Sequence, residues 1–278
     1  MYPFVKMQGL GNDFVVMDAT KQPITLTAAL IQQMANRRLG VGFDQLLLVE
    51  PAQDPACDFF FRIYNADGSE AGQCGNGARC MAVFIQRKGL STRTDLRLQT
   101  ITSQVQLRIV GSETVQATLE APRFQANDIP FQAEGDHEGN QLYHEVKLPD
   151  ETVRLSVVNV GNPHAVIVVD ALACDQVHRV GEALSRHPAF PEGVNVGFMQ
   201  VADKQLVRLR VFERGTGETL ACGSGACAAM VVGRRNGLLQ ERVTVNQPGG
   251  DLMIDWQGPG LPIQMTGPAK WVFEGVWN

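Results

Sequence analysis

The chain has 278 residues, of which 44% are hydrophobic and 19% charged; this is ordinary globular composition and excludes an intrinsically disordered protein. Its net charge of −5 lacks the basic surplus with which nucleic-acid-binding proteins neutralise phosphates, so no nucleic acid partner is expected. The N-terminus lacks the basic and apolar blocks of a signal peptide, and no apolar run approaches the roughly 20 residues that span a bilayer. We therefore expect a cytoplasmic protein with no membrane segment, and the length favours about two domains.

The first part of the chain is rich in β-branched and aromatic runs, which are typical of strands. Strands are predicted at 14–18, 45–49, 59–64, 96–100, 105–110 and 115–120. Two helices are predicted among them, at 27–38 and at 75–88. Gly40 and Gly89 stand where these helices should end, because glycine readily adopts the left-handed conformation that closes a helix.

The second part of the chain follows a similar order. Strands are predicted at 156–160, 165–169, 194–201, 206–212, 243–246 and 252–256. Helices are predicted at 176–187 and at 223–236, the latter ending at Gly237. The polar stretch 124–151 between the two parts carries no motif. Many strands with few helices indicate an α+β fold rather than strict strand–helix alternation.

Two segments of the chain repeat each other. The sequence CGNGARCMAV at 74–83 aligns with CGSGACAAMV at 222–231, an offset of 148. Upstream, Gly11-Asn12 matches Gly161-Asn162 at an offset of 150, and the same shift brings Gln45 to Asn195 and Asn65 near Glu213. We therefore predict two homologous halves, 1–119 and 120–264, each too long to be a solenoid repeat.

The six cysteines fall into two groups. None is spaced as C-x-x-C, which excludes zinc ribbons and thioredoxin-type motifs. For four of them the expectation is a small buried hydrophobic side chain: Cys57, Cys80, Cys174 and Cys227. The other two, Cys74 and Cys222, each precede a Gly-x-Gly at the start of a predicted helix, at matched positions of the repeat.

A cysteine at a helix start has a defined chemistry. The free N–H groups and partial positive charge of a helix N-terminus bind anions such as carboxylates, and the same field lowers the pKa of a thiol. If both helix starts face one cleft between the halves, they can hold one carboxylate, with a sulfur on either side of the adjacent carbon. One thiolate would remove a proton and the other thiol would return one to the opposite face, which inverts a stereocentre.

Seven motifs, taken together, resemble the diaminopimelate epimerase family of pyridoxal-phosphate-independent isomerases. They are MQGLGNDF at 7–14, GFDQ at 42–45, YNADGS at 64–69, QCGNGAR at 73–79, GNPH at 161–164, EGVNV at 192–196 and ERGTGETLACGSG at 213–225. The resemblance implies two similar halves, each a mostly antiparallel sheet wrapped around a central helix, with the active site in the cleft between them. It also implies that 265–278 returns to the first half.

The resemblance implies epimerisation of LL-2,6-diaminopimelate to the meso form, in lysine and peptidoglycan-precursor biosynthesis. Cys74 and Cys222 are then the catalytic pair, with Cys74 as the base on the LL substrate. His164 and Glu213 correspond to positions that tune the protonation of the cysteines. The substrate-binding positions are Asn12, Gln45, Asn65, Gly75, Asn76, Asn162, Asn195, Glu213, Arg214, Gly223 and Ser224.

These assignments make chemical sense, although each has a plainer alternative. Arg214 is a natural fork for the distal carboxylate, and Glu213 can accept from an ammonium. Alone, the asparagines would be turn residues, Arg214 and Glu213 a solvated pair, and His164 a partly buried structural side chain. The remaining histidines have no motif support and are expected to be surface or structural residues: His137, His144, His178 and His187.

No cofactor is expected, because the motifs contain no metal cluster, dinucleotide fingerprint or Schiff-base lysine. The resemblance implies a homodimer, although Phe273 lacks the hydroxyl of the tyrosine common at that place. A proline or hydroxyproline racemase would have less reason to carry the distal residues. A phenazine-type isomerase is disfavoured by the presence of both cysteines. A redox-sensing amino-acid-binding protein, with a regulatory Cys74–Cys222 disulfide, is the alternative from another class.

Overall fold

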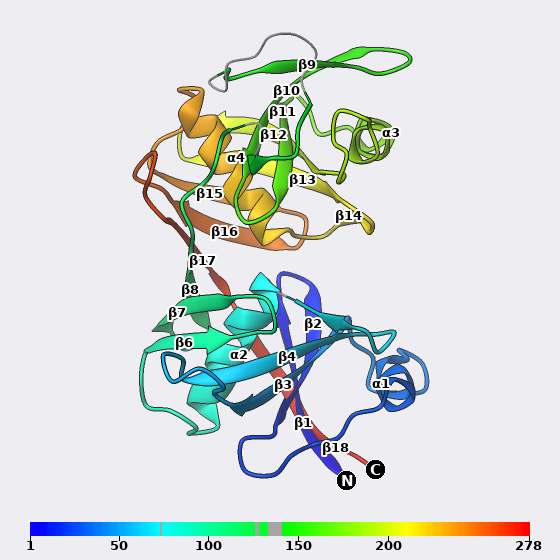
Figure 1. Cartoon of the computed structure of the whole chain (residues 1–278), viewed down its shortest axis with the longest axis vertical. Coiled ribbons are helices and arrows are strands. Elements are labelled where there is room, and N and C mark those ends of the chain that lie inside the picture. The colour runs from blue at the N-terminus through cyan, green and yellow to red at the C-terminus, as the bar shows by residue number, and fades with distance from the viewer. Residues whose placement is uncertain (73, 126–127, 133–140) are drawn as a thin grey trace. The chain divides into compact units, whose positions relative to one another are not determined.

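The computed structural model describes residues 1–72, 74–125, 128–132 and 141–278 (Figure 1). Gln73 of the first cysteine motif and His137 lie outside the described residues. The chain forms two compact units, and each is α+β. Unit 1 comprises Met1–Thr118 and Thr266–Asn278, and unit 2 comprises Leu119–Met265. Strand β17 (Ile263–Pro268) contains the second boundary between them.

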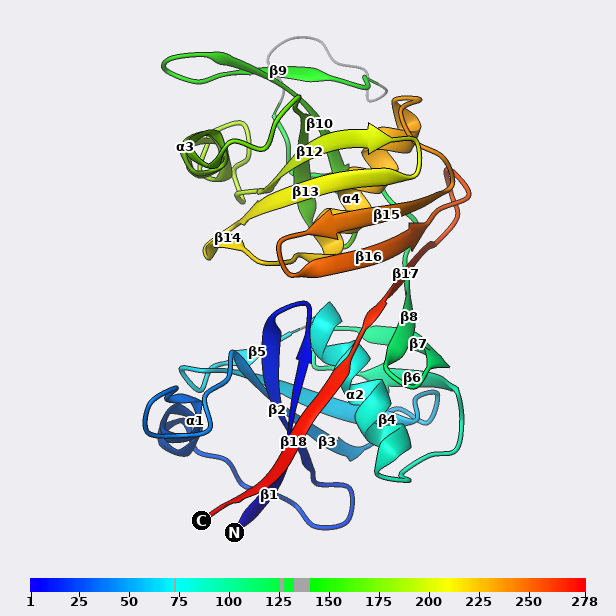
Figure 2. The same cartoon turned by 180° about the vertical axis from the view of Figure 1, so that it is seen from behind.

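Unit 1 is a mostly antiparallel sheet with two helices. Its strands are β1 (Tyr2–Gly9), β2 (Asn12–Asp18), β3 (Gln45–Pro51), β4 (Phe59–Asn65), β5 (Glu70–Ala71), β6 (Asp95–Gln99), β7 (Gln104–Gly111), β8 (Thr114–Leu119, whose last residue belongs to unit 2) and β18 (Lys270–Trp277), and its helices are α1 (Ala28–Ala35) and α2 (Gly75–Arg87). Two neighbouring pairs, β2–β3 and β4–β6, are parallel. The last strand, β18, pairs antiparallel with β1, so both chain ends lie side by side (Figure 2).

Helix α2 forms the centre of unit 1, and its residues 76–85 are all buried. It begins at Cys74, the N-cap, and ends before Gly89, whose φ of 67° matches the predicted glycine stop. Arg79 on this helix is fully buried and donates from Nη2 to Asn76 Oδ1 at 2.7 Å. Helix α1 covers a separate apolar cluster that includes Met34 and Phe43.

Unit 2 repeats this plan. Its strands are β9 (His144–Lys147), β10 (Thr152–Asn159), β11 (Pro163–Val168), β12 (Asn195–Asp203), β13 (Leu206–Glu213), β14 (Gly217–Thr219), β15 (Arg242–Gln247) and β16 (Gly250–Asp255), and its helices are α3 (Cys174–Ser185) and α4 (Gly223–Arg235). The parallel pairs are β11–β12 and β13–β15. Helix α4 is the central helix of unit 2, and its residues 225–233 are all buried.

The strand registers of the two units match closely. Phe14 pairs with Gln45 in the parallel pair β2–β3, and His164 pairs with Asn195 in β11–β12, so both partners are shifted by 150. Helices α2 and α4 each have 13 residues and each start one residue after a cysteine. The sequence repeat therefore corresponds to equivalent elements at equivalent places.

All the predicted strands and helices are found, with ends shifted by a few residues. The prediction missed β1, β5, β9, β14, β17 and β18. Strand β1 was not predicted because Lys6 interrupts its apolar pattern. Lys6 is nevertheless buried, since its charge is paired with that of Asp13. Strands β5 and β14 are too short to produce a pattern. The prediction that Cys174 is buried was wrong, because it is exposed at the first turn of α3.

Candidate active site

In unit 1, three of the predicted substrate-binding residues lie at neighbouring strand ends. Asn12 opens β2, Gln45 opens β3 and Asn65 closes β4. Gln45 pairs directly with Asn65 in the ladder, and its Nε2 donates to Asn65 Oδ1 at 3.0 Å. A turn through Leu10 and Gly11, both at positive φ, joins β1 to β2 and presents Asn12 at the same edge.

Cys74 caps helix α2 beside this edge. Its half-buried sulfur accepts from Gly77 N at 3.3 Å and lies 3.8 Å from Asn12 Oδ1. Gly77 must be small, since a Cβ there would come within 3.3 Å of the Cys74 sulfur. The first amides of α2, at Gly75 and Asn76, precede the intrahelical ladder and can receive an anion.

In unit 2 the equivalent strand ends carry Asn162, Asn195 and Glu213. Asn162 lies in the turn before β11, Asn195 opens β12, and Glu213 closes β13. Asn195 Oδ1 accepts from the backbone N–H of Arg214 at 2.9 Å, which fixes the bend after β13.

Cys222 caps helix α4 and is only 5% exposed. Its sulfur accepts from Gly225 N at 3.4 Å and lies 3.3 Å from Glu213 Oε2 and 3.5 Å from Ser224 Oγ. Burial raises the pKa of the Cys222 thiol well above its usual range. The Glu213 charge adds to this, and the Ser224 and Gly225 hydrogen bonds offset only part of it. The expectation that a helix start favours thiolate is therefore wrong for Cys222, which is a protonated thiol at neutral pH.

His164 is fully buried on β11 and is neutral. Burial, followed by the charge of Arg214, lowers its pKa to about 3. Its Nε2 lies 3.1 Å from Asn162 Oδ1 and 3.0 Å from Ser224 Oγ, whereas its Nδ1 has no hydrogen-bond partner among the described residues. We assign the proton to Nε2, because an unpaired buried N–H costs more than an unpaired lone pair. The Ser224 hydroxyl can then accept from His164 and donate to the Cys222 sulfur.

Arg214 is exposed at the rim of this cluster. Its Nη1 donates to Glu192 O at 2.5 Å, and its other N–H groups can reach an anion. Gly193, at a φ of +71°, lies directly beneath it: a Cβ there would approach Arg214 Cδ to 2.8 Å. The EGVNV motif therefore supplies both the carbonyl and the space that hold the guanidinium.

The predicted site residues thus gather in two clusters, one per unit. The unit 1 cluster holds Asn12, Gln45, Asn65, Cys74, Gly75 and Asn76, and the unit 2 cluster holds Asn162, His164, Asn195, Glu213, Arg214, Cys222, Gly223 and Ser224. Each cluster contains one cysteine, one helix start and side chains from three adjoining strand ends.

Sequence reasoning missed two residues that hold these side chains. Thr219 Oγ1 donates to Glu213 Oε1 at 2.5 Å and orients that carboxylate. Gln247 Oε1 accepts from the buried N–H of Cys222 at 2.8 Å. Thr219 lies within a recognised motif and could have been suspected. Gln247 comes from β15, 25 residues further on, and no local signal marks it.

Other side chains outside the clusters have ordinary surface contacts. His178 pairs with Glu218 at 3.1 Å, and His187 lies 3.2 Å from the Lys147 carbonyl. Across the described ranges, no group of three or more His, Cys, Asp or Glu side chains could hold a metal ion. Within those same ranges, no helix has both the length and the apolar character to cross a membrane.

Comparison with known proteins finds relatives that match nearly the whole chain. The family model described as diaminopimelate epimerase matches residues 4–124 and 156–272. A diaminopimelate epimerase of Coxiella burnetii (strain Dugway 5J108-111) is 58% identical over 274 residues, covering 99% of this chain and 98% of that protein. The same identity and coverage hold for the protein of that name from the RSA 493 strain of the species.

Solved structures share the fold at low identity. A probable proline racemase from Agrobacterium radiobacter K84 has a TM-score of 0.69 at 15% identity, covering 100% of this chain and 93% of its own. A hydroxyproline epimerase from Agrobacterium vitis has a TM-score of 0.68 at 16% identity, covering 99% of this chain and 91% of its own. A Bacillus anthracis phenazine biosynthesis protein has a TM-score of 0.66 at 18% identity, covering 99% of both chains.

Proposed function

Because this chain belongs to the diaminopimelate epimerase family, we propose that it epimerises LL-2,6-diaminopimelate to the meso form by two-base proton transfer. One observation carries the proposal: a cysteine caps the central helix of each unit, at equivalent positions of the repeat. The reaction is an isomerisation that consumes no co-substrate and needs no cofactor. It would serve lysine and peptidoglycan-precursor biosynthesis in the cytoplasm.

The two cysteines divide the proton transfer. The Cys74 thiolate removes the α-proton of the LL substrate, and the electron pair stays on the α-carbon as a carbanion. The Cys222 thiol then donates its proton to the opposite face, which leaves Cys74 as thiol and Cys222 as thiolate. The raised pKa of Cys222, due to burial and Glu213, supports its role as the acid in this direction.

The helix starts stabilise the carbanion. The proposal requires one substrate to contact both clusters, with its reacting carboxylate against the amides of Gly75, Asn76, Gly223 and Ser224. Preorganised N–H donors stabilise the charge that spreads onto this carboxylate as the α-proton leaves. The donors already point outward from two helix ends, so they need no reorganisation during the reaction.

The remaining polar side chains suit the second amino acid group of the substrate. Arg214 can take the distal carboxylate with its outward N–H groups. Amide side chains bind the two ends without adding net charge: Asn12, Gln45, Asn65, Asn162 and Asn195. A proline racemase has no distal group to bind, so these residues favour the longer substrate.

Proton NMR in D₂O tests the proposal. The reduced protein, incubated with LL-diaminopimelate and no pyridoxal phosphate, should form the meso isomer with deuterium at the α-carbon. Cys74→Ala should abolish both signals, whereas Cys57→Ala, which removes a thiol outside the clusters, should keep them. A folded wild-type protein that gives neither exchange nor conversion would reject the diaminopimelate assignment.

The alternatives give different results in the same assay. Turnover of proline or 4-hydroxyproline instead of diaminopimelate would indicate a racemase of the related kind. Binding of an amino acid without α-hydrogen exchange would indicate the redox-sensing protein. Mild oxidation should inactivate the epimerase reversibly through a Cys74–Cys222 disulfide, and full activity after verified formation of that bond would reject this part of the proposal.

We also propose that the protein is a homodimer that forms through strand β18. This strand exposes Val272, Phe273 and Val276, which are unusual side chains to leave in water on one strand. The Phe273 ring packs edge-on against Phe4 of β1 at 6.1 Å, so an aromatic surface persists without a hydroxyl. Light scattering should show a dimer that Phe273→Ser weakens, and a monomeric wild-type protein would reject the proposal.

A further inference from the structure

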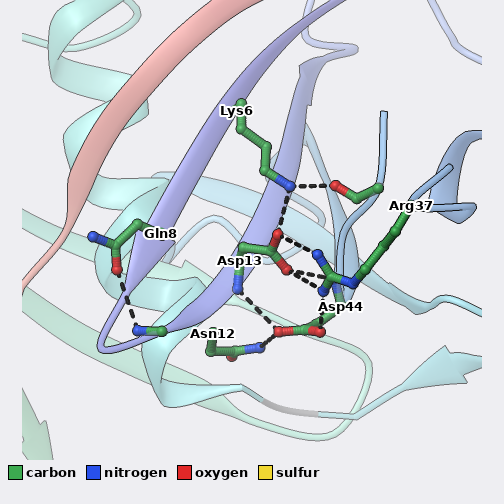
Figure 3. A network of polar contacts seen from close by, with 8 residues as sticks. Lys6, Gln8, Asn12, Asp13, Arg37 and Asp44 are labelled. Carbon is green, nitrogen blue, oxygen red and sulfur yellow. Dashed lines mark hydrogen bonds and ion pairs between the residues drawn. The ribbon is translucent and has the colours of Figure 1, made fainter. Parts of the chain in front are cut away.

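Four charged side chains form a connected network next to Asn12 (Figure 3). Asp13 accepts from Lys6 Nζ at 2.6 Å and from the two terminal nitrogens of Arg37 at 2.9 and 2.8 Å. Arg37 Nη2 also donates to Asp44 Oδ1 at 2.6 Å. We call Lys6, Asp13, Arg37 and Asp44 the charged network. Its two positive and two negative charges balance.

The charged network reaches Asn12 through Asp44. Asp44 Oδ2 accepts from Asn12 Nδ2 at 2.9 Å and from the backbone N–H of Asp13 at 3.1 Å. An ionised carboxylate only accepts hydrogen bonds, so Asn12 must turn its NH₂ group towards Asp44. The Asn12 carbonyl oxygen then faces the Cys74 sulfur, 3.8 Å away.

The repeat in unit 2 lacks this network. A shift of 150 residues places Ser156, Pro163, His187 and Val194 where unit 1 has Lys6, Asp13, Arg37 and Asp44. The strand ends keep the same register without the charges, and Val194 is completely buried. The fold therefore does not require a charged network at this place. Because the equivalent positions of unit 2 lack these charges, we look for the role of the network in the residues it adjoins in unit 1, Asn12 and Cys74.

The burial and the charges of the network indicate that it orients Asn12 rather than stabilises the fold. Burial opposes ionisation of Asp13, but the hydrogen bonds and charges of Arg37 and Lys6 outweigh it and hold the pKa of this carboxyl well below its usual range. Asp13 is therefore a fixed anion that holds Arg37 by two hydrogen bonds. The outer pair, Arg37 and Asp44, is 57% and 43% exposed, and such exposed pairs add little to the stability of a fold.

We propose that Arg37 and Asp44 are positioning residues that lock the amide of Asn12, so that its carbonyl oxygen faces the Cys74 sulfur. A carbonyl oxygen accepts from S–H and repels S⁻, so this orientation makes the Cys74 thiolate more basic. A strong base suits a carbon acid as weak as the α-carbon of an amino acid. This consequence rests on the proposed function, whereas the orientation itself does not.

Charged and titratable groups other than the network also lie on α2 and on the strands that pack against it. Helix α2 packs against β1, β2, β3 and β7, which carry Asp18, Glu50 and Arg108 besides residues of the network. Asp18 accepts from Thr20, and Glu50 pairs with Arg62 at 3.2 Å. Arg108 is exposed and pairs with Asp95 at 2.7 Å. On α2 itself, Arg79 donates to Asn76, and burial raises the pKa of Cys80 to about 12, so Cys80 stays neutral.

Asp44→Asn tests the orientation against a matched control, Asp95→Asn. The pairs are alike: Arg37–Asp44 spans 2.6 Å with exposures of 57% and 43%, and Arg108–Asp95 spans 2.7 Å with 60% and 46%. In Asp44→Asn, Arg37 retains the new amide oxygen, and the new NH₂ group takes the place of the oxygen that accepted from Asn12 and from the Asp13 N–H. We expect Asn12 to flip and accept from this group, while the Asp13 N–H loses its partner. The NMR signals of the Asn12 side-chain NH₂ should lose the downfield shift that a carboxylate partner causes, and Asp95→Asn should leave them unchanged.

Thiol reactivity gives the second readout. The pH midpoint for alkylation of Cys74 by iodoacetamide, followed by mass spectrometry of its peptide, should fall by about 0.7 units in Asp44→Asn, the equivalent of one neutral hydrogen bond. Below the midpoint this is about a fivefold increase in the thiolate fraction. Arg37→Gln should shift the midpoint less. In this variant Asp44 still accepts from Asn12, but it loses the hydrogen bond from Arg37 that holds its own position.

A double-mutant comparison separates orientation from simple loss of charge. In an Asn12→Ala background, Asp44→Asn should no longer move the Cys74 midpoint. The proposal is overturned if the shift persists there, or if the Asn12 signals do not change in Asp44→Asn. Neither readout needs turnover, so a protein without epimerase activity that shows these shifts would reject the proposed function alone.

Discussion

The sharpest consequence of the unit 2 geometry concerns the proton on Cys222. Glu213→Gln removes a carboxylate whose Oε2 lies 3.3 Å from the sulfur and keeps the size of the side chain. At an effective dielectric constant of about 20, two unit charges at this distance interact by about 5 kcal/mol, which is equivalent to about 4 pKa units. This is an upper limit because Glu213 is partly exposed, so we expect the pKa of Cys222 to fall by about 2 to 4 units. Burial, the larger cause, still holds it above normal.

The alkylation rate of Cys222 measures this change. Below the midpoint, the rate follows the thiolate fraction, but a less basic thiolate is also a weaker nucleophile, with a Brønsted coefficient of about 0.5. A fall of about 2 to 4 units therefore predicts iodoacetamide labelling of Cys222 about 10 to 100 times faster at pH 8. Fully buried Cys227, on the same helix, reports any general unfolding.

Glu218→Gln is the matched control for charge. It removes the same charge from the neighbouring strand β14, where Glu218 binds Arg210 rather than the cysteine. This variant should label Cys222 at the wild-type rate. Equal rates in Glu213→Gln and the wild type, with Cys227 protected in both, would refute the argument that Glu213 holds the proton on Cys222.

Two further predictions concern stability and binding. The folded-state pKa of His164, about 3, lies below its ordinary value of 6.5, so the unfolded chain takes up a proton that the folded chain excludes. The stability that the neutral histidine contributes is complete above pH 6.5 and is lost as pH falls towards 3, about 2 kcal/mol of it by pH 5. Urea unfolding at pH 7 and pH 5 should show this loss in the wild type and in exposed His178→Asn but not in His164→Asn; the same loss in all three would contradict the assignment. Gly193→Ala should raise the KM for diaminopimelate more than it lowers kcat, because the new Cβ would displace Arg214, whereas Gly215→Ala, at a φ of +78° with open space around it, carries only the backbone cost of about 1 kcal/mol. Equal KM values in the two variants would show that Arg214 does not hold the substrate.

The repeat and the motifs predicted much of the fold because their signals are local. Runs of β-branched residues marked the strands, and the Gly-x-Gly after each cysteine marked both central helices. The same local reasoning was wrong about the state of Cys222. A helix start does favour thiolate, but burial depends on side chains that arrive from β13 and β15. Sequence spacing does not reveal that environment.

The charged network escaped prediction for a related reason. Lys6 and Asp13 come from β1 and β2, and Arg37 and Asp44 come from the loop between α1 and β3. None has a partner at a spacing that indicates a helix or strand contact. Asp44 stood within a recognised motif, between Phe43 and Gln45, yet its contact with Asn12 spans 32 positions. Motifs showed which residues matter, and the strand registers show how they are held.

The pairing of β1 with β18 has a consequence for how the protein is made. Unit 2 is continuous in the chain, so it can complete its fold as soon as residue 265 has left the ribosome. Unit 1 is synthesised first, yet β1 has only its neighbour β2 until residues 266–278, which contain β18, emerge. Until then the edge of β1 is unpaired, and Phe4 has no Phe273 to cover it. The half that begins first therefore finishes last, and its nascent form is the species most in need of protection from aggregation.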